Sequence, residues 1–81
     1  MPFAYALIST EPGAIEEVLA SLKKIREVKE AYGVYGVYDI ITKINAESMN
    51  ALKETITSHI RQLNKVISVN TIIVLDPSST P

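Results

Sequence analysis

The sequence predicts an α+β fold, a ferredoxin-like βαββαβ sandwich in which two helices cover a four-stranded antiparallel sheet. Three observations lead to this fold class. Two segments have apolar residues at helical spacing, four segments are rich in β-branched and aromatic residues, and the six alternate in the order βαββαβ. The first and third strands take the central positions of such a sheet.

The first half of the chain contains the first strand and the first helix. Residues 3–9 are aromatic and aliphatic and predict a strand. Pro12 suits the first turn of a helix, and Glu11 complements the positive end of the helix dipole. The predicted helix has one apolar stripe opposite its charged residues, which consists of Ile15, Val18, Leu19, Leu22 and Ile25.

The next two strands are predicted at residues 28–34 and 37–46. Gly36 lies between them, and we expect it to adopt a positive φ angle in the turn. Asn45 is expected to cap the second helix. The apolar stripe of that helix consists of Met49, Leu52, Ile56, Ile60 and Leu63.

The last strand is predicted at residues 66–75, after which the chain becomes polar. We expect residues 1–76 to form a single domain and residues 77–81 to form a flexible tail. Hydrophobic residues make up 47% of the chain and charged residues only 21%, so disorder is not expected. The chain has no cysteine, which excludes disulfides, thiolate metal sites and a cysteine nucleophile.

The charge of the chain argues against direct binding of nucleic acid. The net charge is −1, the isoelectric point is about 5.7, and the eight basic residues are scattered rather than arranged in a stripe. The N-terminus lacks the features of a secretory signal, and no apolar run approaches the roughly 18 residues that span a membrane. We therefore expect a cytoplasmic protein without membrane contact.

Apolar residues occupy both faces of the predicted strands, whereas a sheet with one wet face alternates apolar and polar residues. Two helices can cover only one of these faces. We expect the other face to pack on a second copy of the chain, because monomers rarely expose so large an apolar patch. The first strand illustrates the pattern, with Phe3, Tyr5 and Leu7 on one face and Ala4, Ala6 and Ile8 on the other.

Asp39 is the residue that most needs an explanation, because it starts a predicted strand whose other residues are mostly apolar. In one interpretation its carboxylate accepts backbone N–H bonds at the turn, as aspartate often does. In the other, the carboxylate receives the ammonium group of a small zwitterion, and Gly36 leaves backbone N–H groups accessible to the ligand. The frequency of aspartate in turns favours the first interpretation.

Few other residues suggest a site. The tyrosines Tyr5, Tyr32, Tyr35 and Tyr38 suit an interface, and the acidic isoelectric point argues against a stacking platform for bases. His59 is the only histidine, so we expect no metal site and no cofactor. The chain has neither a nucleophile elbow nor a phosphate-binding glycine loop, and we expect it not to be an enzyme.

Beyond these arguments, the chain resembles a stand-alone RAM module, the effector-binding domain of the Lrp/AsnC family of transcriptional regulators. The resemblance covers nearly the whole chain. It is carried above all by the run Gly36-Val37-Tyr38-Asp39-Ile40-Ile41, which follows Val28-Lys29-Glu30-Ala31-Tyr32. It also includes Pro12-Gly13, the helix that begins Ala14-Ile15-Glu16-Glu17-Val18, and Thr71-Ile72-Ile73-Val74-Leu75.

The resemblance implies a fold of the dimeric α/β-barrel type, in which two sheets face each other. It also implies that dimers join into octamer- or decamer-like rings and bind small effectors, usually amino acids, between dimers. By position it assigns effector binding to Gly36, Tyr38 and Asp39, with Thr71 as a weaker candidate. The resemblance further implies a role in transcription regulation. Because 81 residues leave no room for a helix-turn-helix, the partners that it suggests are full-length Lrp/AsnC regulators.

Three departures from the family leave the effector open. Tyr35 stands where Thr or Ser is frequent, Val69 where Thr is common, and Lys65 where Gly is frequent. Two other functions also stay open. One is a purely structural oligomerisation module with an empty pocket. The other is a small enzyme of the dimeric α/β-barrel type, which needs a polar cavity between helices and sheet, whereas both predicted helix stripes are aliphatic.

Overall fold

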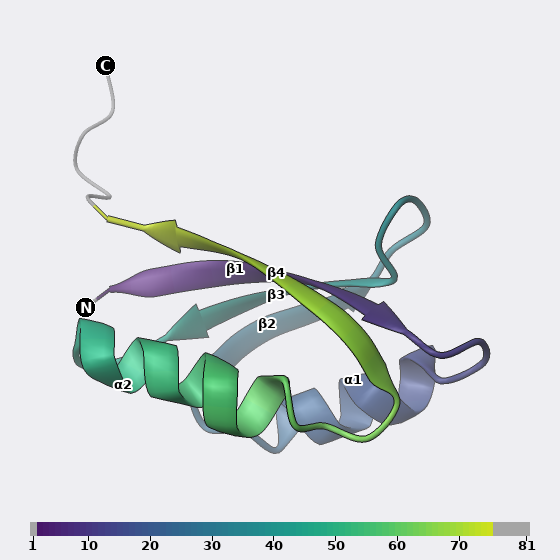
Figure 1. The fold of residues 1–81 in the computed structure, drawn as a ribbon, viewed down its shortest axis with the longest axis horizontal. Coiled ribbons are helices and arrows are strands. Elements are labelled where there is room, and N and C mark those ends of the chain that lie inside the picture. Colours follow the sequence, from purple (N-terminus) through teal and green to yellow (C-terminus); the bar gives the residue numbers. More distant parts are fainter. Residues whose placement is uncertain (1, 76–81) are drawn as a thin grey trace.

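In a computed structural model, residues 2–75 are described and form one antiparallel sheet with two helices on one face (Figure 1). The strand order is β2-β3-β1-β4, so the first and third strands are central. This confirms the ferredoxin-like α+β fold. The elements are β1 (Phe3–Thr10), α1 (Ile15–Lys23), β2 (Val28–Gly33), β3 (Ile40–Asn45), α2 (Met49–Glu54), the π-helical segment η1 (Thr55–Ile60) and β4 (Val66–Val74).

The core lies between β1 and the two helices. On the helix side of β1, small and large residues are completely buried, and each pairs with a residue of β3 on the same side. The two alanines of this row leave room for helix side chains to approach the sheet. The fully buried residues include Ala4, Ala6 and Ile8 of β1, Ile40 and Ile44 of β3, Leu22 of α1, and Leu52 and Ile60 of the second helix.

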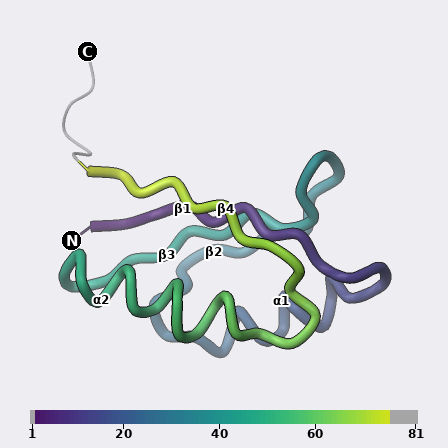
Figure 2. Tube along the Cα trace, viewed as in Figure 1, coloured from purple at the N-terminus to yellow at the C-terminus, as the bar shows by residue number. Residues whose placement is uncertain are grey.

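Residues 34–39 form a loop between β2 and β3, which rises away from the helix layer (Figures 1 and 2). The predicted strand at 37–46 was therefore wrong at its beginning, because β3 starts only at Ile40. Val37 has a side chain suited to a strand, but it is almost fully exposed and lacks a paired neighbour in the sheet of the described chain. The loop closes through the Val34 N–H, which donates to the Asp39 carbonyl at 2.9 Å.

The two glycines of this hairpin have different roles. Gly33 faces α1, and a Cβ atom at this position would lie 3.3 Å from Cγ2 of Ile15, so the missing side chain allows close packing. Gly36 does not adopt a positive φ angle, and a Cβ atom there would meet no described atom within 4 Å. The expectation of a positive φ at Gly36 was wrong, because the six-residue loop turns without a left-handed residue.

The second helix begins later than predicted. Its N-cap is Ser48, whose hydroxyl accepts from the Ala51 N–H at 3.1 Å. Asn45, the predicted cap, ends β3 instead, and its N–H donates to the Glu27 carbonyl. From Thr55 onward the helix widens into η1, where the Arg61 N–H donates to the carbonyl five residues earlier, at Ile56.

Two turns use the left-handed backbone region. Gly13 has a φ of 79° before α1, and Lys65 has a φ of 71° before β4. For a non-glycine residue this conformation costs about 1–2 kcal/mol. Two contacts hold Lys65 in place: its ammonium lies 2.9 Å from Oε1 of Glu17, which raises the pKa of Lys65, and its carbonyl accepts from the Glu11 N–H.

The predicted tail at 77–81 lies outside the described residues. Within residues 2–75, the helices are too short to cross a membrane.

The positive φ angle of Lys65 predicts that, at this position, a glycine variant is more stable than an alanine variant. Lys65→Gly should have a free energy of unfolding about 1 kcal/mol higher than Lys65→Ala, since both lose the ion pair but only glycine relaxes the backbone. Denaturant titration measures the difference. The matched control is Lys24, which has a φ of −82°, so that alanine should be the more stable variant there. Equal or higher stability of Lys65→Ala would contradict the expectation.

Candidate functional site

The Asp39 carboxylate ties the 34–39 loop to the end of β1. Its Oδ2 accepts from the backbone N–H of Thr10 at 2.9 Å and from the Thr10 hydroxyl at 3.4 Å. The Asp39 N–H donates to the Ile8 carbonyl at 3.0 Å, so side chain and backbone both continue the β1–β3 pairing. The carboxylate thus accepts a backbone N–H, as in the first interpretation from the sequence, but the donor is at the end of β1 and not in the turn itself. Both side-chain contacts involve the same oxygen, Oδ2.

The Tyr38 phenol reaches β4. Its oxygen accepts from Nδ2 of Asn70 at 2.6 Å. Asn70 pairs with Leu7 of β1, whereas the buried Ala6 faces the helices, so Asn70 lies on the side of the sheet that carries no helix. At the base of the loop, next to β3, Asp39 therefore contacts β1 and Tyr38 contacts β4. Sequence reasoning missed Asn70, although it stands out as an amide within an otherwise mostly aliphatic strand.

The other two residues assigned by resemblance lie elsewhere. Gly36 is in the exposed outer part of the loop, beside the exposed Tyr35 and Val37. Thr71 pairs with Ala6 and therefore faces the helices, on the opposite side of the sheet from Tyr38. Its Oγ1 is buried without a hydrogen-bond partner among the described residues. The structure thus brings Tyr38 and Asp39 together at the loop base and separates both from Thr71.

The helix-free side of the sheet is largely apolar. Two of its polar groups contact neighbouring side chains. The Lys43 ammonium lies 4.5 Å from the centre of the Phe3 ring. The Tyr32 phenol donates to Glu30 Oε1 at 3.0 Å, which raises the pKa of Tyr32. The 34–39 loop rises beside this face (Figure 1). By register, its apolar residues are Phe3, Tyr5 and Leu7 of β1, Tyr32 of β2, Ile41 of β3, and Ile72 and Val74 of β4.

These features describe an open polar corner, made by Asp39, Tyr38 and Asn70, at the border of a wide apolar face. Hydrogen-bonding groups at such a border can orient a small polar ligand while the apolar face receives a second protein surface. Among residues 2–75, no three potential metal ligands from His, Asp and Glu gather in one place.

The structural role of Asp39 predicts a loss of stability when its carboxylate is removed. Asp39→Ala should lower the free energy of unfolding by about 1–3 kcal/mol, because the part-buried Thr10 N–H loses its acceptor. Asp39→Asn keeps an acceptor oxygen and should lose less. Denaturant titration of both variants, with the exposed Glu54→Ala as a control that changes little, tests this. An Asp39→Ala variant as stable as the control would show that the hydrogen bond between Asp39 and Thr10 contributes little to stability.

Comparison with solved structures finds several proteins with a similar fold. The crystal structure of FFRP-DM1 has a TM-score of 0.89 and 37% identity, over 93% of this chain and 100% of that chain. The hypothetical protein PHS023 from Pyrococcus horikoshii has a TM-score of 0.89 and 36% identity, over 96% and 94% of the two chains. AsnC from E. coli has a TM-score of 0.87 and 27% identity, but the match covers 99% of this chain and only 54% of AsnC.

Two more distant structures were determined with a bound amino acid. They are a transcriptional regulator from Neisseria meningitidis in complex with L-Met and a feast or famine regulatory protein from M. tuberculosis complexed with L-methionine. Their TM-scores are 0.83 and 0.78 at 21% and 23% identity, so they show a shared fold alone.

The family can also be identified from the sequence itself. A comparison with curated protein sequences finds no match. The family model of the Lrp/AsnC ligand binding domain, however, matches residues 3–80, which is nearly the whole chain. Together with the four-stranded sheet, this match confirms the resemblance noted from the Gly36–Ile41 run: the chain belongs to the Lrp/AsnC ligand-binding-domain family.

Proposed function

We propose that this chain senses an amino acid at the corner formed by Asp39, Tyr38 and Asn70, and that it assembles with copies of itself through the helix-free face. Family membership gives the chain a regulatory, effector-binding role, and its neighbours are regulators rather than enzymes. The observation that carries the proposal is a carboxylate fixed in position by one of its oxygens, Oδ2, at the border of an uncovered apolar surface.

The chemistry of the corner supports an α-amino acid. Oδ1 of Asp39 is available to accept from a ligand ammonium, while the bond to Thr10 keeps the carboxylate from rotating away. The phenol of Tyr38, the residue before Asp39, is held by Asn70 and offers a second hydrogen-bonding group. Backbone N–H groups of the exposed Gly36 segment remain accessible to the ligand carboxylate.

A second copy completes the site in this proposal. The corner is open on the single chain, and the residues beside it, Tyr35 and Val37, expose apolar surface that one chain leaves in water. A ligand held between copies favours the arrangement that binds it more tightly, and it shifts the assembly by that difference in affinity. Regulators that carry a DNA-binding segment would read out this shift through co-assembly.

A purely structural module remains the second candidate. One observation favours it: Asp39 already has a partner, Thr10, on the ligand-free chain, and the carboxylate is therefore explained without an effector. The two candidates differ in what they predict for binding and agree on assembly.

Calorimetric titration with the twenty amino acids distinguishes them. We expect at least one to bind, and we expect Asp39→Asn to weaken binding by about tenfold or more, because the charge is lost while the acceptor for Thr10 remains. Tyr38→Phe should weaken binding less, and Glu54→Gln, a carboxylate on the outside of α2, should have no effect. Asp39→Ala is avoided, since it also alters stability. Absence of binding, or unchanged affinity of Asp39→Asn, would favour the structural module.

Assembly is tested by sedimentation velocity at micromolar concentration. The wild-type chain should sediment well above its monomer mass of 8.9 kDa. Ile72→Lys places a charge on the helix-free face, beside Tyr5 of the central strand β1, and should dissociate the assembly, because an unpaired charge cannot be buried between two sheets. Ala20→Lys adds the same charge to the exposed side of α1 and should leave the assembly unchanged. A wild-type chain that stays monomeric would contradict the proposal.

A further inference from the structure

A lysine lies among the apolar residues of the helix-free face. Lys43 belongs to the central strand β3 and pairs with Tyr5 of β1, which places both side chains on this face. Lys43 is half-buried, and its ammonium lies 4.5 Å from the centre of the Phe3 ring. Among residues 2–75, this ammonium forms no ion pair with a carboxylate. On the single chain its charge is therefore balanced only by an aromatic ring and by solvent.

The same face carries one acidic residue. Within residues 2–75, Glu30 of β2 is the only acidic residue that belongs to a strand, and it pairs with Lys43. Cross-strand partners share a face, and their Cα atoms lie about 5 Å apart. Even so, the two side chains lean apart. Lys43 leans toward Phe3, whereas Oε1 of Glu30 accepts from the Tyr32 phenol at 3.0 Å, on the side of the 34–39 loop.

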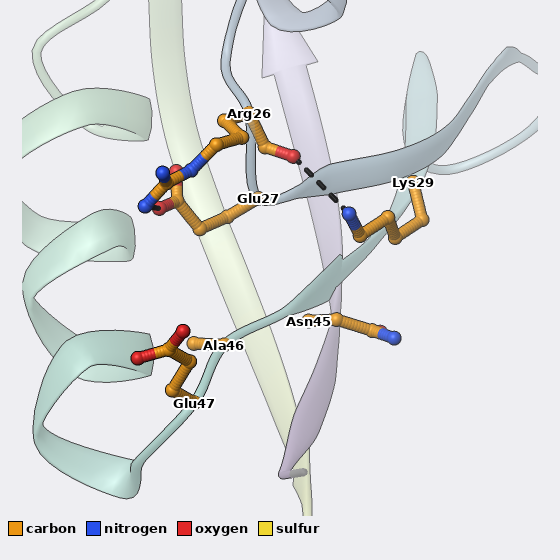
Figure 3. Close-up of a pocket in the computed structure, with 6 residues that line it drawn as sticks. All are labelled: Arg26, Glu27, Lys29, Asn45, Ala46 and Glu47. Atoms are coloured by element: carbon orange, nitrogen blue, oxygen red, sulfur yellow. Dashed lines mark hydrogen bonds and ion pairs between the residues drawn. The ribbon is translucent and has the colours of Figure 1, made fainter.

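Two other carboxylates near the end of β3 are not placed to balance Lys43. Figure 3 shows that the Asn45 side chain points away from Glu47. Asn45 pairs with Phe3 and therefore lies on the helix-free side, so Glu47 is directed elsewhere. The carboxylate of Glu27 lies 3.3 Å from the Arg26 guanidinium, with which it forms an ion pair (Figure 3).

Assembly through the helix-free face removes Lys43 from water. The side chains around it on this face are aromatic or aliphatic, as those of Phe3, Tyr5 and Ile41 show. An ammonium that is buried without a partner is strongly unfavourable, whereas one that is paired with a carboxylate is tolerated. The surface that covers this face must therefore bring a carboxylate to Lys43. A second copy of the chain brings Glu30.

We propose that Lys43 pairs with Glu30 of a second copy, and that this ion pair fixes the register in which the two sheets face each other. The inference rests on the assembly proposed above. Two packed sheets lie about 10 Å apart, a gap that a lysine and a glutamate side chain bridge together. In a twofold-symmetric pair the contact forms twice, and the axis passes close to the row that holds both residues. An apolar surface without a carboxylate would leave Lys43 unpaired, so the ion pair also favours self-association.

Charge reversal tests the ion pair, with sedimentation equilibrium of the full chain as the measurement. Lys43→Glu and Glu30→Lys should each raise the dissociation constant of the assembly about tenfold or more, because like charges then meet across the interface. An equimolar mixture of the two variants should assemble about as tightly as the wild type, since each charge regains an opposite partner on the other copy. Pairing within one chain predicts no recovery, because each variant carries two like charges on the same chain.

A matched control separates this contact from a general attraction between an acidic and a basic face. The double variant Glu30→Gln with Ser68→Lys carries the same charge as Glu30→Lys. Its new lysine, however, lies on the β4 side of the helix-free face, where Ser68 pairs with Ser9. Mixed with Lys43→Glu, the double variant should assemble about tenfold more weakly than the first mixture, because only one of the two ion pairs can form.

The outcomes distinguish this inference from the assembly on which it rests. A wild-type chain that stays monomeric overturns both. The ion pair alone is overturned if the wild type assembles and neither charge reversal weakens it. It is also overturned if the first mixture assembles no better than its two components, or if the control mixture assembles as tightly as the first. Circular dichroism of each variant verifies that the fold is retained.

Discussion

Two helices can shield only one side of a four-stranded sheet, and this geometric limit governs the molecule. On the shielded side, the alanines of β1 let the helices approach closely, and the core is completed by aliphatic side chains of α1, α2 and η1. On the other side, the same strand carries Phe3, Tyr5 and Leu7, which are larger and only partly buried. At about 25 cal/mol per Å² of apolar surface, covering such a face is worth many kcal/mol before the costs of association. The candidate corner of Asp39, Tyr38 and Asn70 lies at the border of that uncovered face.

Asp39 illustrates how one carboxylate can serve both the fold and a site. Its bond to the Thr10 N–H holds the loop against β1, and the same bond fixes the direction of the remaining oxygen. A carboxylate that is anchored in this way loses little conformational freedom when a ligand binds, so more of the interaction energy appears as affinity. Tyr38 is held in a similar manner by Asn70, from the opposite edge of the sheet. The corner is thus preorganised by contacts that also stabilise the hairpin.

Much of this fold could be predicted because it follows from periodicity. The helix stripes, and the alternation of Ala4, Ala6 and Ile8 with larger residues, are local patterns that burial enforces. The limits of β3 could not be predicted, because a strand begins where a partner strand begins, and Val37 has the composition of a strand without such a partner. The role of Asn70 depends on the register between β1 and β4, which is a long-range property.

The candidate site was also predictable only in part, because the contacts of its residues depend on how distant strands pair. Asp39 was conspicuous as a lone acid among apolar residues, but its bond to Thr10 joins residues 29 positions apart and depends on the pairing of β1 with β3. That Thr71 faces the helices follows from its pairing with Ala6. The cap at Ser48 had a competing local signal, since Asn45 is also a good capping residue.

The edge strand β4 has a consequence for the life of the free chain. It is nine residues long, and it contains neither proline nor a charged residue that would deter another strand from adding to it. Natural sheets usually carry proline or charged residues at an open edge. The opposite edge strand, β2, has Lys29 and Glu30. A single copy is therefore prone to aggregation through β4, and the self-assembly proposed above would also protect solubility if it covered this edge.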